Sequence, residues 1–285
     1  MSEETKEAEV KDYHLFESIT LEEPESPVSY EIAMPGVTLL TGEDGIGKTT
    51  VCKSIYEYTA NAKVPAFKAT HVTMLDARLL ECYSMRPGSL YTNNAAGNRA
   101  LRRMRAVSLA AYDEVSETGV EVVEAIESTI RGRMFYDEDS QKFFFKPSGK
   151  GKLRVPAENL PSGVRTLGVI QMIAAKFYDK PTRPPILIID DLEAALHPAW
   201  QIVYANLLFK FAVKGVRVLS TAHGVYTLNA ALHVMRFHEE DGNRPRVHYR
   251  AYIGSAIGDR SEFFDVSDDP NALMDPYALL MRKFL

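Results

Sequence analysis

Residues 42–49 read Gly-Glu-Asp-Gly-Ile-Gly-Lys-Thr and constrain the fold more than any other stretch of the chain. They match the phosphate-binding loop pattern G-x-x-x-x-G-K-[ST] at every fixed position. The apolar run 37–41 before them predicts a buried strand, and residues 50–60 after them predict a helix. Strand, loop and helix in this order are the setting that the motif requires. The alternative is a glycine-rich turn that happens to precede Lys-Thr.

Each residue type in this loop has a physical reason to contact a bound nucleoside triphosphate. Glycines let successive backbone N–H groups turn toward an anion, and the N-terminus of the following helix adds partial positive charge. The Lys48 ammonium is predicted to reach the β- and γ-phosphates, and the Thr49 hydroxyl to ligate Mg²⁺. The residues expected to bind the nucleotide here are Gly42, Glu43, Asp44, Gly45, Ile46, Gly47, Lys48, Thr49 and Thr50.

Composition excludes several classes of protein. The chain has 285 residues, of which 46% are hydrophobic and 25% charged, as expected for one large α/β domain or two small ones. No apolar run approaches the roughly 20 residues that span a bilayer, and the first residues lack a signal-peptide pattern. We therefore expect a cytoplasmic protein with no membrane partner. A net charge of −5 gives no global case for nucleic-acid binding, so any such case must be local.

Patterning along the chain predicts one tail and one domain. Residues 1–12 are acidic and lack apolar periodicity, which indicates a flexible tail, and residues 13–285 are expected to form a single domain. Residues 13–41 predict an antiparallel β-layer that leads into the phosphate-binding loop. Residues 80–132 predict a helical insertion, and residues 133–158 a small β-meander.

Finer expectations follow from the same patterns. A glycine- and asparagine-rich break is expected at residues 91–98, inside the helical insertion. Further elements are predicted as helices at 163–178 and 200–214 and as strands at 66–75, 186–189, 216–220 and 247–253. Cys52 and Cys82 form no framework of paired spacings, so neither is assigned a catalytic or metal role.

Residues 186–190, Ile-Leu-Ile-Ile-Asp, predict a second buried strand, which ends in a carboxylate. Such a strand would aim Asp190 at the Mg²⁺ that Thr49 holds. Asp191 comes next and is placed to orient an attacking water. Because Asp is one methylene shorter than Glu, Glu193 is the alternative for that role. The alternative is that Asp191 is an ordinary polar residue at the end of a strand.

Residues 186–198 resemble the segment Asp-Glu-Pro-Glu-Ala-His-Leu-His-Pro of ABC-type ATPases that are not transporters. This group includes the SMC and RecF class and, more closely, the ATPase domains of the OLD (overcoming lysogenization defect) family. Residues 160–165 stand where the group carries its signature motif, matched by Ser162 and Gly163 at the start of a helix. The meander before them is similar to a β-rich piece of OLD-like proteins. Residues 216–224 resemble the strand that ends in the switch histidine, matched by His223.

Order and spacing agree with this resemblance, because 27 residues separate Gly163 from Asp190 and 33 separate Asp190 from His223. The resemblance implies a P-loop NTPase of ABC-ATPase type with a mainly parallel sheet flanked by helices. It implies ATP and Mg²⁺ as cofactors, and Lys48, Asp191, Glu193 and His223 as catalytic residues. In this group the Ser-Gly signature caps the γ-phosphate held by a second copy. An ATP-dependent homodimer is therefore expected.

The resemblance implies an Mg²⁺-dependent ATPase that switches between dimer and monomer in DNA repair, genome maintenance or defence against mobile DNA. The alternative is an ATP-gated interaction module with little turnover, in which the helical insertion docks a separately encoded effector protein. The departures are Asp191 for the usual Glu, Leu192 for the usual Pro, a Pro-Ser-Gly-Val signature and no recognisable Q-loop glutamine. Slow hydrolysis is expected from them.

The sequence also bears on DNA contact, adenine stacking and the presence of a nuclease or transporter function. Arginines within 98–105 offer a local surface for DNA phosphates; alternatively they form a solvated face or pair with the acidic run 121–127. Tyr13 or Phe16 lies about where an adenine-stacking aromatic would sit, although strand aromatics are usually core residues. About 60 residues follow His223, too few for the nuclease domain of OLD nucleases, so nuclease activity is not expected. A transporter subunit is a weaker third option.

Overall fold

The computed structural model describes most of the chain. The described residues are 19–22, 29–61, 72–76, 95–115, 117–177, 185–240, 247–257 and 260–274. The expected tail at 1–12 and the candidate adenine-stacking residues Tyr13 and Phe16 lie outside them.

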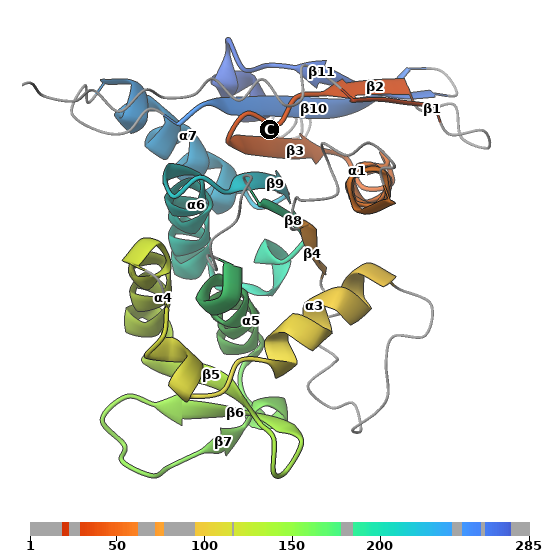
Figure 1. Ribbon diagram of the computed structural model, residues 1–285. Coiled ribbons are helices and arrows are strands. Elements are labelled where there is room, and N and C mark those ends of the chain that lie inside the picture. Colours follow the sequence, from red (N-terminus) through yellow and green to blue (C-terminus); the bar gives the residue numbers. More distant parts are fainter. Residues whose placement is uncertain are drawn as a thin grey trace, which may run out of the picture.

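A six-stranded sheet forms the centre of the molecule (Figure 1). Its spatial order is β11-β10-β3-β9-β8-β4, and only β11 runs antiparallel to its neighbour. The strands are β3 (Val37–Gly42), β4 (Val72–Asp76), β8 (Ile186–Asp190), β9 (Arg217–Thr221), β10 (Tyr249–Ile257) and β11 (Arg260–Asp265). All five residues of β4, β8 and β9 are buried, as expected for parallel strands covered on both faces. The expected mainly parallel α/β sheet is confirmed.

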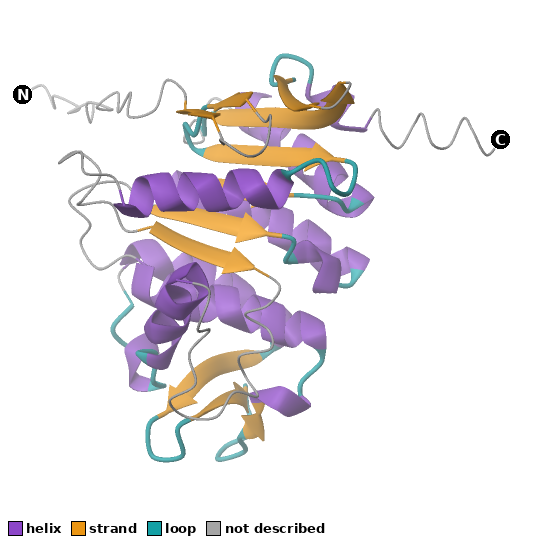
Figure 2. Ribbon diagram, turned by 90° about the vertical axis from the view of Figure 1, so that its right-hand side faces the viewer, coloured by secondary structure: helices purple, strands orange, loops and turns teal. Residues whose placement is uncertain are grey.

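A small antiparallel pair lies beside this sheet, near its β11 edge (Figure 2). It consists of β1 (Ile19–Glu22) and β2 (Ser29–Ile32), with Ile19 opposite Ile32. The expected antiparallel layer before the phosphate-binding loop is therefore present.

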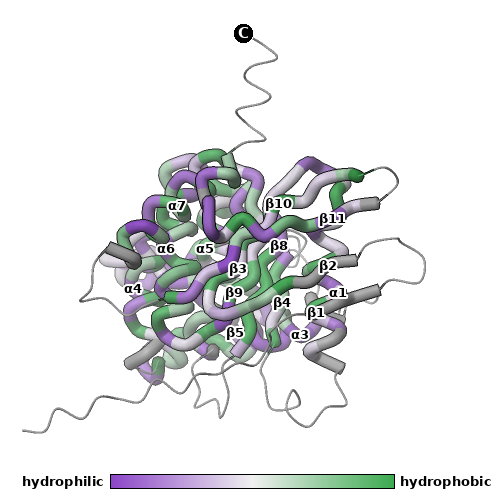
Figure 3. Tube along the Cα trace, turned by 90° about the horizontal axis from the view of Figure 1, so that it is seen from above, coloured by the Kyte–Doolittle hydropathy of each residue, from purple (hydrophilic) through white to green (hydrophobic). Residues whose placement is uncertain are grey.

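Helices cover both faces of the sheet. Helix α1 (Lys48–Asn61) packs on one face with Val51 and Ile55 fully buried. Helix α6 (Pro198–Val213) lies on the other face and packs against α7 (Val225–Glu240). Helix α6 begins where it does because the His197 side chain accepts a hydrogen bond from the Ala199 N–H, and Pro198 occupies the first turn. The tube view shows hydrophobic colour along the central strands (Figure 3).

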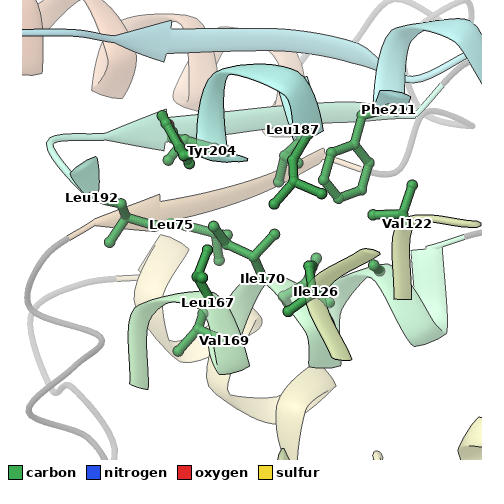
Figure 4. Close-up of a cluster of buried hydrophobic side chains, with 14 of the residues drawn as sticks. Leu75, Val122, Ile126, Leu167, Val169, Ile170, Leu187, Leu192, Tyr204 and Phe211 are labelled. Carbon is green, nitrogen blue, oxygen red and sulfur yellow. The ribbon is translucent and has the colours of Figure 1, made fainter. Parts of the chain in front are cut away.

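The larger hydrophobic cluster joins the sheet to α4 (Glu117–Ile130), α5 (Ser162–Phe177) and α6. Figure 4 shows its side chains pointing toward one another from strands and helices that are distant in sequence. Leu187, Leu167 and Phe211 are fully buried in it. Burying each such side chain contributes about 2 kcal/mol, so this cluster fixes α5 relative to the sheet.

The helical insertion contains α3 (Ala95–Arg105), the short helix η2 (Ala110–Tyr112) and α4. The expected break at 91–98 is wrong at its C-terminal end, because α3 begins at Ala95 and includes Gly97 and Asn98. Packing overrides their weak helix propensity, since Leu101 and Met104 are fully buried on the same helix. Residues 77–94 lie outside the described part of the chain.

A three-stranded antiparallel sheet follows the insertion, at the end of the molecule opposite β10 and β11 (Figure 1). It consists of β5 (Gly132–Asp137), β6 (Lys142–Pro147) and β7 (Val155–Pro156), and η3 (Ala157–Asn159) leads from it into α5. Strands therefore occur where the meander 133–158 was expected. The sequence reading did not single out α7, β11 or the short helix η5 (Pro270–Met274).

Candidate functional site

The loop between β3 and α1 depends on glycine for its shape. Gly42, Gly45 and Gly47 have φ angles of 134°, 82° and 97°, which other residues adopt only with strain. Gly42 also lies against β10, because a Cβ atom placed there would be 2.5 Å from the Gly254 carbonyl oxygen. The loop thus needs glycine for backbone conformation and, at Gly42, for space.

Lys48 opens α1 and folds back over the loop. Its side chain is buried, and its Nζ donates to the carbonyl oxygens of Gly42 (2.8 Å) and Glu43 (2.7 Å). Burial lowers the pKa of Lys48, while the carboxylates of Asp44, Asp190, Asp191 and Glu193 oppose that effect. Four acidic groups around one lysine make a neighbourhood that favours a bound divalent cation.

Two adjacent aspartates stand at the end of β8. Asp190 is buried, and its Oδ1 accepts a hydrogen bond from Thr221 Oγ1 at 3.1 Å. Thr221 Oγ1 in turn accepts the Asp191 N–H at 2.8 Å. Asp191 has φ of +56°, a left-handed conformation that is uncommon for a residue other than glycine. Such a backbone, held by a neighbouring strand, is typical of functional sites.

Sequence reasoning missed Thr221. In the structure β8 and β9 are parallel neighbours with Ile189 opposite Ser220, which brings Asp190 and Thr221 together. The sequence alone does not show that these two strands pair, so it gave no indication of Thr221.

His223 lies between the phosphate-binding loop and the end of β8. Its Nδ1 is 3.5 Å from Asp44 Oδ1, and its Nε2 is 4.0 Å from Asp191 Oδ1. Burial lowers the pKa of His223, and Lys48 lowers it further against the opposing effect of Asp191 and Asp44. Burial raises the pKa of Asp191, and nearby Asp190 and Asp44 raise it too, whereas His223 and Lys48 lower it.

Glu193 lies behind His223, in the short helix η4 (Glu193–Ala195). Its side chain is fully buried, and Oε1 accepts the His223 backbone N–H at 2.6 Å. Its other oxygen, Oε2, has no hydrogen-bond partner among the described residues. Burial raises the pKa of Glu193 to about 7. Gln201 Nε2 donates to the Glu193 carbonyl at 3.3 Å, which ties η4 to α6.

Ser162 and Gly163 are the first two residues of α5. Ser162 is exposed, and its Oγ donates to the Ala195 carbonyl at 3.3 Å. Gly163 lies against the Trp200 ring, which a Cβ atom would approach to 3.0 Å. The structure therefore places these two residues at a helix N-terminus, where Ser162 contacts Ala195 and Gly163 contacts Trp200. Thr49 is exposed and Thr50 half-buried in the first turn of α1.

None of the three glutamines follows a strand of the main sheet. Gln141 lies in the turn between β5 and β6. Gln171 is buried in α5, where its Oε1 accepts the Met134 N–H at 3.0 Å. Gln201 lies in α6 beside Glu193. The departure at the Q-loop that the sequence indicated therefore stands.

The arginines of α3 are partly used inside the fold. Arg103 donates a hydrogen bond to Thr73 Oγ1 on β4, and Arg99 lies 5.7 Å from the centre of the Tyr56 ring. Arg102 is exposed. The expected surface of phosphate-binding arginines is therefore smaller than the sequence suggested.

The acidic run that these arginines were alternatively expected to hold has other partners. Glu121 pairs with Lys214 at 3.0 Å, and Glu127 pairs with Arg133 at 2.7 Å. Both ends of the run are thus occupied by cations from outside α3.

The donor set around Asp190 suits Mg²⁺, a hard cation that takes one or two carboxylates and keeps several waters. Across the described residues no cluster of three or more His, Cys, Asp or Glu side chains could hold a metal by itself. A site built from Thr49, Asp190 and phosphate oxygens needs no such cluster. Among the described helices, none combines the length and apolarity needed to cross a bilayer.

No protein-family model and no curated protein sequence matches the chain. Several solved structures are similar to the chain. An SMC head bound to the C-terminal winged-helix domain of ScpA has a TM-score of 0.52 at 12% identity, covering 83% of this chain and 92% of that one. The SMC head domain from Thermotoga maritima has a TM-score of 0.44 at 12% identity, covering 84% and 93%. A dimeric bacterial ABC transporter cassette has 0.42 at 14%, covering 83% and 90%.

The first of these similarities defines the fold. The chain has the α/β architecture of an SMC head. At this level of identity the likeness extends to the fold and no further.

Proposed function

We propose that the chain binds ATP with Mg²⁺ and hydrolyses it, and that ATP binding joins two copies. The observation that carries this proposal is the meeting of three segments distant in sequence. The phosphate-binding loop with Lys48, the end of β8 with Asp190 and Asp191, and the end of β9 with His223 lie within hydrogen-bonding or ion-pair reach of one another. Parallel strands bring their carboxyl ends to one edge, where α/β proteins bind ligands.

The residues have separate roles in this proposal. Loop N–H groups and Lys48 bind the phosphates, and Thr49 with Asp190 would hold Mg²⁺, which supplies charge neutralisation when bound. Asp191 is exposed enough to contact and orient a water molecule. His223 would contact the γ-phosphate, since its ring lies between Asp44 of the loop and Asp191. Glu193 is fully buried and bonded to the His223 backbone, which supports a positioning role more than direct contact with water.

The start of α5 supports the proposed dimer. Ser162 and Gly163 open a helix of 16 residues, whose N-terminal N–H groups attract an anion. Ser162 is exposed at this helix start, and in the proposed dimer the anion is the phosphate held by the loop of a second copy. Such a two-fold dimer would have two composite sites.

The proposed setting is DNA repair, genome maintenance or defence against mobile DNA, by analogy with OLD-like and SMC-like ATPases. A second candidate is an ATP-gated interaction module with feeble turnover, in which the insertion 80–132 docks an effector. The short Asp191 side chain and the lack of a glutamine after a main-sheet strand favour it. The cytoplasmic location and the single domain at 13–285 remain parts of this proposal.

Two substitutions test the proposal. Lys48→Ala should abolish ATP binding in a fluorescent-nucleotide titration, because it removes the cation that contacts the phosphates. Asp191→Asn should keep ATP binding, lower turnover by about 10²-fold or more, and accumulate an ATP-bound dimer in size exclusion. An oligomeric state that ignores ATP in the wild type and in both variants would contradict the dimer.

Steady-state turnover with and without DNA separates the two candidates. Stimulation of hydrolysis by DNA supports the first. ATP binding with negligible turnover in every condition supports the second.

A further inference from the structure

Residues 146–152 form the end of β6 and the turn after it, read Lys-Pro-Ser-Gly-Lys-Gly-Lys, and contain three lysines and no carboxylate. We call this segment the lysine turn. All three lysine side chains are exposed, and no ion pair joins any of them to a described carboxylate. The whole chain carries a net charge of −5, so this cation cluster is a local feature.

The lysine turn is shaped and held by its backbone. Gly149 and Gly151 have φ angles of 71° and 57°, so the chain bends sharply twice. At its base the Ser148 N–H donates to the Arg131 carbonyl at 2.9 Å, and the Leu153 N–H donates to the Lys150 carbonyl at 3.1 Å. The three lysines therefore project from a fixed hairpin at the end of the molecule that carries β5, β6 and β7 (Figure 1).

The surroundings limit where an anion can bind. Arg131 is exposed beside the turn, which adds a fourth cation. A hollow of about 580 Å³ is lined by part of the turn, including Lys146, and by the carboxylates of Asp113 and Glu127. Glu127 already pairs with Arg133 at 2.7 Å. Those carboxylates repel anions from the hollow. An anionic partner would therefore contact the outer side of the turn.

We propose that the lysine turn with Arg131 is a contact surface for the phosphodiester backbone of nucleic acid. Phosphate contacts require flexible cations and no apolar surface. A protein interface would instead call for aromatic and apolar residues, and lysine is depleted there. The segment offers one large exposed apolar side chain nearby, Leu153 at 51% exposure, which is too little for an interfacial membrane anchor. This surface is separate from α3 and does not depend on ATP hydrolysis.

The test measures binding of the full chain to labelled duplex DNA, single-stranded DNA and RNA of equal length at several salt concentrations. Lys146→Gln, Lys150→Gln and Lys152→Gln, made together, should weaken binding at least about tenfold. The slope of log K against log salt should fall in magnitude by about 2 to 3, because three phosphate contacts are lost. The corresponding triple change to arginine should retain binding, and the three nucleic acids distinguish the source of the phosphates.

A matched control removes three cations elsewhere, with Lys53→Gln on α1, Lys210→Gln on α6 and Arg236→Gln on α7. It should retain most of the affinity, and the lysine-turn variant should keep the thermal midpoint and ATP affinity of the wild type. Three results would overturn the inference: no binding of any nucleic acid by the wild type, equal affinity and salt slope in the lysine-turn variant, or binding to anionic vesicles alone. None of these results bears on ATP binding, so the two proposals can fail separately.

Discussion

At the scale of single residues, the unusual group is Glu193, a buried carboxyl with one oxygen on the His223 backbone and the other unsatisfied. Burial raises its pKa from 4.5 to about 7. The native state therefore holds a proton between those pH values that the unfolded chain has released. The free energy of unfolding should fall across this interval as pH rises, by up to about 3 kcal/mol from this group.

Glu193→Gln should remove that pH dependence, because the amide cannot ionise but can still accept the His223 N–H. Urea unfolding at pH 4.5 to 7.5 would measure it, with the wild type losing stability relative to the variant as pH rises. The same variant should keep ATP affinity and turnover near neutral pH, whereas Glu193→Ala should lower turnover by displacing His223. Parallel unfolding profiles for wild type and Glu193→Gln would contradict the buried-acid assignment.

Individual residues were the hardest part to predict from sequence. Lys48 was anticipated from the loop motif, Asp190 from the apolar run that it ends, and His223 from the resemblance to the switch histidine. The left-handed backbone of Asp191 and the hydroxyl of Thr221 that holds it could not, because they depend on the register of β8 against β9. The burial of Glu193 likewise depends on how η4 packs against α5 and α6.

At the scale of elements, α5 is the part on which the proposed dimer depends. Ser162 is exposed at the N-terminus of this helix, and its side chain donates a hydrogen bond to the Ala195 carbonyl. Ser162→Arg should therefore leave the fold and ATP binding intact while blocking approach of a second copy. We expect ATP-dependent dimerisation, measured by light scattering, to be lost.

Glu158→Arg provides the matched control, since Glu158 is also exposed and lies four residues earlier in η3. It should dimerise with ATP as the wild type does. Equal dimerisation of both variants would argue against the α5 N-terminus as part of the interface.

Elements were predicted best where burial dictated the pattern. The continuous apolar run at β8 and the helical spacing of α5 gave bounds within one residue of those observed. Helix α3 was mistaken at its start because glycine and asparagine signal a break, while the packing of Leu101 and Met104 decides otherwise. Strand β11 has no long apolar run, since it lies at the edge of the sheet.

At the scale of the whole molecule, neither the lysine turn nor the proposed two-fold dimer can be inferred from bulk properties of one chain. The net charge of −5 predicts nothing about the lysine turn, because an average conceals local clusters. Symmetry is also invisible in one chain. The proposed dimer nevertheless makes a specific claim about two chains, namely that the exposed Ser162 of one copy faces the phosphate-binding loop of the other.

In a head-to-tail dimer, each composite site takes Lys48 from one copy and Ser162 from the other. A mixed dimer of a Lys48→Ala copy and a Ser162→Arg copy therefore keeps one intact site, although neither variant forms one alone. Affinity-tagged Lys48→Ala protein should capture untagged Ser162→Arg protein when ATP is added. Capture without ATP, or no capture at all, would oppose the composite site. If the sites act independently, an equal mixture should also recover up to about half of wild-type turnover, because neither variant pairs with itself, so the dimers that form are mixed and each has one of its two sites working.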